Sequence, residues 1–189
     1  MHQTKSTVSS NSSMASSSSK NFTPFLLLLL LLLLTASVSF SAAIKEKSTH
    51  LHLYIHEIFT GPSATAITVV KSPLNNSSFG SIGILDDVLR EGSDPNSKFL
   101  GRFQGFIADA GKEKSAFLSA FSFVFSEGMY NGSTLTIMGR AQLGGVIERS
   151  IVGGTGKFRM ARGYSLMKIL GRPTPVTVIF EVDLYVIHY

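Results

Sequence analysis

The sequence has no cysteine, no tryptophan and few acidic residues. Its 189 residues include 12 aspartates and glutamates against 17 lysines and arginines, and the first acid is Glu46. Without cysteine, disulfide scaffolds, thiolate zinc sites, iron–sulfur clusters and cysteine nucleophiles are excluded. A charged fraction of 15% and a hydrophobic fraction of 44% exclude a disordered chain. The length favours a single folded domain.

The N-terminal segment has the pattern of a secretory signal peptide. Residues 1–24 are rich in serine and carry two lysines and no acid, and an unbroken run of nine leucines spans 26–34. Small residues fill most of 35–43, as in a cleavage zone. A membrane anchor needs about 20 apolar residues, and a plastid transit peptide does not explain the leucine block. We therefore predict a cleaved signal peptide and leader at 1–43, a folded domain at 44–189, and secretion.

Removal of the leader lowers the formal net charge from +5 to +3, because the leader holds two lysines and no acid. The remaining chain has no block of lysine and arginine with interleaved aromatic residues, so it is not expected to bind nucleic acid. No membrane association is expected after cleavage. Asn-x-Ser sequons begin at Asn75, Asn76 and Asn131, and in a secreted protein they predict N-glycosylation.

From residue 51 onward, apolar residues recur with a period of two between turn signals, which is typical of β-strands. Strands are predicted at 51–59, 64–70, 79–85, 98–108, 116–126, 133–140, 146–152, 163–170 and 176–189. Their short links favour antiparallel neighbours, and closure of the sheet removes its exposed edges. The prediction is an all-β fold, an eight-stranded antiparallel β-barrel, whose interior is filled by side chains or holds one small ligand.

Among the ionisable residues, Glu57 shares a strand face with four apolar residues, Leu51, Leu53, Ile55 and Phe59. If that face lines the barrel interior, burial raises the pKa of the Glu57 carboxyl and suits it to bind a ligand oxygen or transfer a proton. The alternative is an acid at the end of a strand that reaches solvent. The alternation by itself leaves both interpretations open.

Other charged residues follow or flank the predicted strands. Asp86 and Asp87 come after the apolar strand 79–85, so one points inward and one outward, or both lie in a solvated turn. Arg102 shares a strand face with Gln104. An inward-facing arginine would bind a polar ligand oxygen, whereas an outward-facing one would lie on the surface or at the barrel rim.

The pattern His50-x-His52 followed by Glu57 imitates the metal-binding spacing of cupins, which are also β-barrels. Two imidazoles on one strand face are able to chelate a metal ion. Glu57 has the opposite parity, however, and no second motif supplies a further histidine. We predict no metal site and no cofactor.

A series of short motifs runs in order through the chain after the leader. They are Tyr-Ile-His-Glu-Ile at 54–58, Ala-Thr-Ala at 64–66, Phe-Gly at 79–80, Leu-Asp-Asp at 85–87, Ser-Lys-x-x-Gly-Arg-x-Gln-Gly at 97–105, Tyr-Asn-Gly-Ser-Thr-Leu-Thr at 130–136, Val-Gly-Gly-Thr-Gly-Lys-Phe-Arg-Met-Ala-Arg-Gly-Tyr at 152–164 and Tyr-Val-Ile-His-Tyr at 185–189. The series resembles the plant dirigent proteins, and the similarity spans essentially the whole region after the leader.

The resemblance implies a secreted barrel of the apoplast or cell wall that forms a homodimer or homotrimer and is similar in fold to allene oxide cyclases. Dirigent proteins capture phenoxy radicals of monolignols such as coniferyl alcohol, made by a separate laccase or peroxidase, and direct their stereoselective coupling in lignan and phenylpropanoid biosynthesis. Some relatives are enzymes that act on quinone methides, as in pterocarpan formation, and others pattern lignin in cell walls. The resemblance favours a stereochemical template without redox activity of its own. It leaves open whether the protein is itself an enzyme.

The resemblance also implies site residues. The candidate acids, which would anchor phenolic oxygens or move a proton, are Glu57, Asp86, Asp87 and Glu148. The candidate substrate-binding residues are Arg159, Arg162, Tyr130 and Arg102. Glu57 takes the place of a lumen aspartate in the family, and its side chain is one methylene longer.

Overall fold

The computed structural model describes residues 22–41, 45–142 and 144–189. The chain divides into two compact units at residue 44. Helix α1 (Phe22–Ser41) contains the whole leucine run and belongs to the first unit. The rest of the predicted signal peptide and leader, 1–21 and 42–43, lies outside the described residues. Within the described part of the chain, no helix combines the length and the apolar character needed to cross a bilayer.

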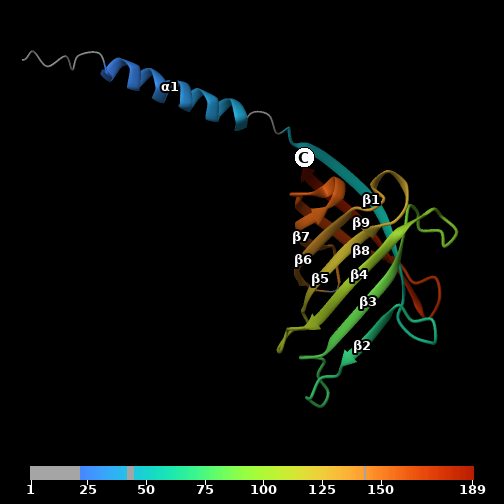
Figure 1. The fold of residues 1–189 in the computed structure, drawn as a ribbon. Coiled ribbons are helices and arrows are strands. Elements are labelled where there is room, and N and C mark those ends of the chain that lie inside the picture. Colours follow the sequence, from blue (N-terminus) through green and yellow to red (C-terminus); the bar gives the residue numbers. More distant parts are fainter. Residues whose placement is uncertain (1–21, 42–44, 143) are drawn as a thin grey trace, which may run out of the picture. The chain divides into compact units, whose positions relative to one another are not determined.

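The second unit is an antiparallel sheet that closes on itself (Figure 1). Its strands are β1 (Lys47–Ile58), β2 (Ala66–Val70), β3 (Ile82–Arg90), β4 (Phe99–Asp109), β5 (Phe117–Phe125), β6 (Thr134–Ala141), β7 (Ile147–Thr155), β8 (Arg162–Gly171) and β9 (Thr177–His188). The order β1-β9-β8-β7-β6-β5-β4-β3 forms a ring, because β3 also pairs with β1. The predicted eight-stranded antiparallel barrel is therefore confirmed.

Strand β2 is a ninth strand that lies beside β3 and outside the ring (Figure 1). Strands β1 and β2 use the same edge of β3: Tyr54 of β1 is opposite Arg90, and Ala66 of β2 is opposite Leu85. The end of β1 leaves β3 and stays paired with β9, where Ile58 is opposite Thr177. At this end of the barrel the wall therefore separates into two parts, β2 with β3 and β1 with β9.

Inward-facing apolar side chains fill the barrel interior. The predicted phenylalanine face of β5 points inward: Phe121, Phe123 and Phe125 are buried and Phe117 is half-buried. The inward apolar face predicted for the last strand is also present, with Val178, Val182, Leu184 and Val186 buried in β9. Each fully buried side chain of this size contributes about 1.5–3 kcal/mol of hydrophobic stabilisation.

Strand β3 is longer than the sequence predicted, and this changes the position of the acidic pair. The prediction ended this strand at Leu85 and left open whether one aspartate points inward and one outward or both lie in a solvated turn. The strand instead continues to Arg90, with Asp86 opposite Gln104 and Asp87 opposite Phe103. Because side chains alternate along a strand, Asp87 lies on the inner face between Leu85 and Leu89.

Candidate functional site

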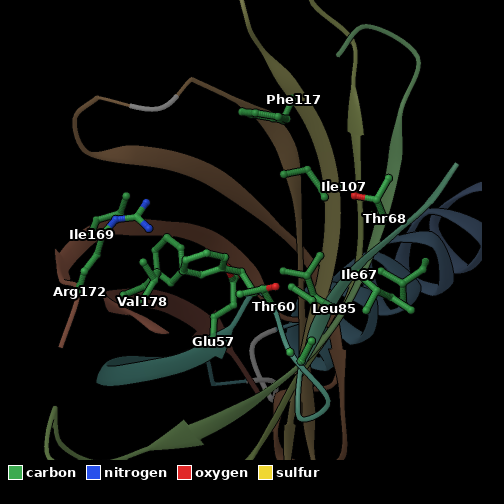
Figure 2. Close-up of a pocket in the computed structure, with 17 residues that line it drawn as sticks. Glu57, Thr60, Ile67, Thr68, Leu85, Ile107, Phe117, Ile169, Arg172 and Val178 are labelled. Atoms are coloured by element: carbon green, nitrogen blue, oxygen red, sulfur yellow. The ribbon is translucent and has the colours of Figure 1, made fainter. Parts of the chain in front are cut away.

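A pocket opens at the barrel end where the wall separates beside β2. Its volume is about 720 Å³, and it is reached where β1, β4 and β8 end and β3, β5 and β9 begin. Apolar side chains supply most of its lining: Ile67, Leu85, Ile107, Phe117, Ile169, Val178 and Phe180. In Figure 2, Leu85 and Ile107 lie on one side of this space and Val178 and Ile169 on the other, with Glu57 between them. The pocket has the size and character of a small-molecule site.

A smaller cavity of about 70 Å³ adjoins the pocket on the side of the core. The two share Glu57 and four apolar residues, Leu85, Ile107, Phe117 and Phe180. Two charged residues line only the deeper cavity, namely Asp87 and Arg149. The deeper cavity is therefore also largely apolar, with Asp87 and Arg149 as the charged residues that it does not share with the pocket.

Glu57 lines the pocket, in keeping with the interior position that its strand face suggested. Burial raises the pKa of the Glu57 carboxyl, and the nearby positive charge of Arg172 partly opposes this shift. The carboxyl makes no hydrogen bond or ion pair with any described residue. It is available to a ligand for hydrogen bonding or proton exchange.

Asp87 is fully buried and lines the deeper cavity. Thr65 donates its hydroxyl hydrogen to Oδ1 of Asp87, whereas Oδ2 has no hydrogen-bond partner among the described residues. Burial raises the pKa of this carboxyl to about 8, although the Thr65 hydrogen bond acts in the opposite direction. At neutral pH the group is a carboxylic acid with an unused O–H or C=O.

Asp86 faces the outer surface, as expected for the second member of an alternating pair. Arg102 donates Nε to Oδ1 of Asp86 at 2.8 Å, and the Gln104 amide donates to the same oxygen at 2.9 Å. The hydrogen bond from Arg102 holds the pKa of Asp86 below its ordinary value. Arg102 and Asp86 therefore satisfy each other on the outside of the barrel and lie away from the pocket lining.

The remaining predicted site residues lie elsewhere. Glu148 is exposed on the outer face of β7, because its neighbours Ile147 and Arg149 point inward. Arg162 begins β8, at the opposite end of that strand from the pocket, and its Nη2 contacts a Glu46 oxygen at 2.6 Å. Arg159 is exposed after the 3-10 turn Gly156–Phe158.

Tyr130 also lies at the far end of the barrel. Its ring packs against Phe158 and Phe125, with centroid distances of 4.8 and 5.8 Å. These contacts, together with its absence from the pocket lining, assign Tyr130 a packing role. Of the eight predicted site residues, the structure brings Glu57 and Asp87 together at one cavity.

Two cationic residues of the site were missed from the sequence. Arg149 is buried, and its position between Ile147 and Ile151 on one strand face was the signal that could have found it. Arg172 lies in the turn between β8 and β9, where the sequence offers no periodic signal, and its guanidinium carbon is 5.5 Å from the Phe59 ring centroid. The first lies at the inner end of the site and the second at its entrance.

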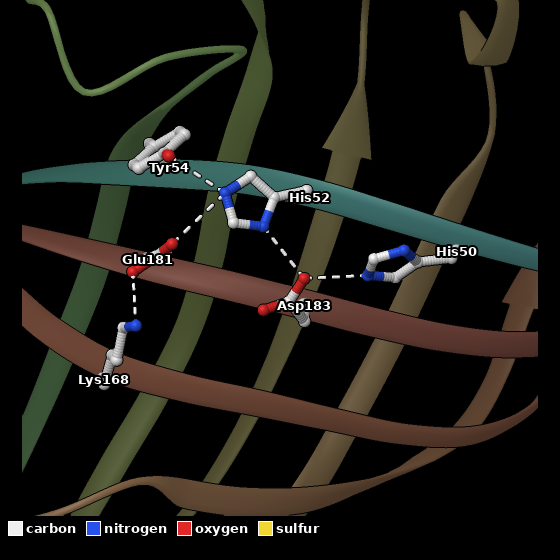
Figure 3. A network of polar contacts seen from close by, with 6 residues as sticks. All are labelled: His50, His52, Tyr54, Lys168, Glu181 and Asp183. Atoms are coloured by element: carbon white, nitrogen blue, oxygen red, sulfur yellow. Dashed lines mark hydrogen bonds and ion pairs between the residues drawn. The ribbon is translucent and has the colours of Figure 1, made fainter.

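The His50-x-His52 pair belongs to a polar network on the outer face of β1 and β9 (Figure 3). Both imidazoles contact the same oxygen of Asp183, at 2.7 and 2.8 Å. Burial opposes the charge of Asp183, but these two contacts hold its pKa below the ordinary value. In the described ranges, no group of three or more histidine, cysteine or acidic side chains is arranged to hold a metal ion.

The sequon asparagines Asn75, Asn76 and Asn131 are exposed in the connections between strands. Asn76 has a positive φ of 60°, a conformation that asparagine tolerates better than most residues. These positions are accessible to a modifying enzyme, and no contact with the pocket lining involves them.

A closed barrel with an apolar pocket, Glu57 in its lining and Asp87 in the adjoining cavity has the features of a small-molecule-binding barrel. The sequence profile described as "Dirigent-like protein" matches residues 48–187. The chain belongs to the dirigent family.

Individual relatives agree with this assignment. The chain is 46% identical over 127 residues to dirigent protein 1 of Arabidopsis thaliana, and the aligned region covers 65% of this chain and 70% of that protein. It is 38% identical over 151 residues to pterocarpan synthase 1 of Glycyrrhiza echinata, covering 77% and 80%. The solved pterocarpan synthase dirigent protein GePTS1 has a TM-score of 0.70 at 38% identity, covering 78% of this chain and 88% of that one.

Proposed function

We propose that this protein binds phenolic radicals in the pocket beside β2 and directs their stereoselective coupling. Its substrates are monolignols such as coniferyl alcohol, oxidised by a separate laccase or peroxidase, and the pathway is lignan and phenylpropanoid biosynthesis. The observation that carries the proposal is the apolar pocket, which Glu57 lines, together with the adjoining deeper cavity, which Glu57 and the buried Asp87 line. Membership of the dirigent family supports it.

The geometry performs this task by orientation. The apolar walls hold an aromatic ring, and the Glu57 carboxyl, whose pKa burial raises, donates a hydrogen bond to the phenolic oxygen. A ring fixed at its oxygen presents one face to its coupling partner. A difference of about 1.4 kcal/mol between two bound orientations gives a tenfold preference for one enantiomer.

The first prediction is that the protein makes pinoresinol formation from coniferyl alcohol and a laccase enantioselective. Because the protein orients radicals rather than generating them, the rate at which the alcohol is consumed is expected to stay unchanged. Chiral chromatography of pinoresinol formed with and without the purified protein measures both quantities. A racemic product excludes this substrate.

A second candidate function is that of an enzyme acting on a quinone methide. Two observations favour it: buried acids whose pKa values are raised, and similarity to proteins named pterocarpan synthase. In this reaction, a carboxylic acid protonates the quinone-methide oxygen while a phenolic oxygen adds to the exocyclic carbon. The proton of the adding hydroxyl then restores the acid, so the carboxyl acts as a general acid.

The second prediction separates these two functions through Glu57→Gln. The amide keeps a hydrogen-bond donor but has no proton to transfer, so a general-acid role predicts a rate loss of about 10²–10⁴-fold with a quinone-methide substrate. A template role predicts retained coupling selectivity and no change in rate. Glu148→Gln, on the outer face, is the matched control. Equal rates for both variants would exclude Glu57 as the acid.

The remaining features of the proposal concern where the protein acts. The leader pattern supports secretion to the apoplast or cell wall, and the exposed sequons support glycosylation there. Detection of N-glycan on the secreted protein tests both. A homodimer or homotrimer and a lignin-patterning role in the wall follow from the family resemblance, and light scattering tests the oligomer.

A further inference from the structure

Arg149 is a buried cation that no carboxylate of the described residues neutralises. Its side chain projects inward from β7, and the residue is 4% exposed. Nε donates to the Ser119 hydroxyl at 2.8 Å, Nη1 lies 3.8 Å from the sulfur of Met167, and the guanidinium carbon is 5.4 Å from the Phe121 ring centroid. Among the described residues, no acidic oxygen lies within ion-pair distance of it.

This arrangement is unusual because burying a charge is costly unless the charge is paired. A hydroxyl, a thioether and a ring face satisfy only part of a guanidinium, which has five N–H donors in a planar fork. Arg149 lines the deeper cavity, so its remaining donors are accessible from the pocket side. The counter-ion that the Arg149 guanidinium lacks would therefore be an anionic group of a bound ligand.

The ionisable groups that line this cavity are Arg149 and two carboxyls, Asp87 and Glu57. Burial raises the pKa of Asp87 to about 8 and raises the pKa of Glu57, so both carboxyls are biased toward their neutral forms. Burial lowers the pKa of Arg149 only to about 10, which leaves it charged. Arg172 adds a second positive charge at the pocket entrance.

The size of the deeper cavity limits which group enters it. A cavity of about 150 Å³ is able to hold a benzene ring, whereas this one measures about 70 Å³. An aromatic ring therefore fits only in the outer pocket of about 720 Å³. A compact group such as a carboxylate fits the inner space and matches the guanidinium in a bidentate geometry.

We propose that Arg149 determines substrate specificity by binding the carboxylate of an acidic phenol, such as a hydroxycinnamate, while the ring lies in the outer pocket. This rests on the proposed function and names its substrate class: phenols with a negatively charged side chain in preference to the corresponding alcohols. Glu57 lines both spaces, so it lies where the side chain of such a phenol would pass from the outer pocket to the deeper cavity.

The test compares two ligands that share a ring and differ in the side chain. Calorimetric titration of the protein with ferulate and with coniferyl alcohol should show ferulate binding at least tenfold more tightly. Arg149→Met, which keeps an unbranched apolar stem and removes the guanidinium, should abolish this preference. Arg159→Met, at the exposed far end, should retain it. Arg149→Lys should retain part of it, because lysine keeps the charge and loses the planar fork.

The outcomes separate this inference from the proposed function. Equal affinity for the two ligands, or a preference that persists in Arg149→Met, overturns the specificity role and leaves phenol binding intact. Absence of binding by both ligands overturns the proposed function as well. If Arg149→Met does not fold, methyl ferulate replaces the variant: the uncharged ester should bind the unchanged protein as weakly as the alcohol, and ester binding as tight as ferulate overturns the inference.

Discussion

Replacing Asp87 with asparagine is expected to stabilise the barrel by about 2–4 kcal/mol at neutral pH. The ordinary pKa of this carboxyl is 3.8, and burial raises it to about 8 in the folded protein. Folding at pH 7 therefore requires uptake of a proton, which an asparagine does not need. The amide matches the shape of the carboxyl and keeps an oxygen for the Thr65 hydroxyl.

The sign of the pH dependence follows from the raised pKa. The contribution of Asp87 to stability is most favourable below pH 3.8, where the carboxyl is protonated in both states. It is lost progressively as the pH rises toward 8, because the unfolded state releases the proton first. The advantage of Asp87→Asn should therefore vanish near pH 3.5 and reach its maximum above pH ~8.

Urea unfolding followed by far-ultraviolet circular dichroism, at several pH values between these limits, measures this difference. Asp86→Asn is the matched control, since Asp86 is exposed and paired with Arg102, a contact worth at most about 1 kcal/mol. Its effect should be small and of opposite sign at neutral pH. An advantage of Asp87→Asn that does not change with pH would contradict the buried-acid interpretation.

The same substitution also bears on function. An asparagine donates a hydrogen bond but transfers no proton, so a template would keep its coupling selectivity while a quinone-methide enzyme would lose rate. A protein that gains stability and loses turnover is the expected pattern for a buried ionisable group retained for chemistry. A carboxyl kept at this energetic cost supports a role in contact with substrate.

Most of the fold could be predicted from the alternation of apolar residues. In β5 and β9, apolar residues at every second position predict that one face of the strand is buried. This is the pattern expected for strands in the wall of a barrel. The extent of β3 was not predictable in this way. Aspartates are depleted in strands and common in turns, so an Asp-Asp pair after Leu85 suggested a strand end.

The site was predictable only where polar residues share a face with apolar ones. Glu57 follows Leu53 and Ile55 with period two, and the structure has it in the pocket. Arg149 shows the same relation to Ile147 and Ile151, but the family resemblance pointed to its neighbour Glu148, which lies on the outer face of the strand. The position of Arg172 in the site depends on the conformation of the β8–β9 turn. Tertiary packing sets that conformation, so the sequence pattern does not predict it.

Replacing Gly163 with alanine is expected to destabilise the barrel by about 3 kcal/mol or more, a cost typical of severe overpacking. Gly163 lies at the start of β8 opposite Val186, with φ at 145°, a conformation that side chains rarely adopt. A Cβ atom there would lie 1.9 Å from the backbone oxygen of Tyr185. The neighbouring strand has no flexible side chain to move away, so pairing of β8 with β9 must shift.

Gly153→Ala provides the matched control, because its Cβ would meet nothing within 4 Å and its φ is not positive. Thermal unfolding should show a free energy of unfolding lower by about 3 kcal/mol or more for Gly163→Ala. For Gly153→Ala the free energy of unfolding should change by no more than about 1 kcal/mol. Gly163 is at the far end of β8 from the pocket residue Ile169, so folded Gly163→Ala protein should still bind phenols. Equal stability of the two variants would show that β8 and β9 pack less closely than described. The position of Val178 and Phe180, which β9 contributes to the pocket, would then be in question as well.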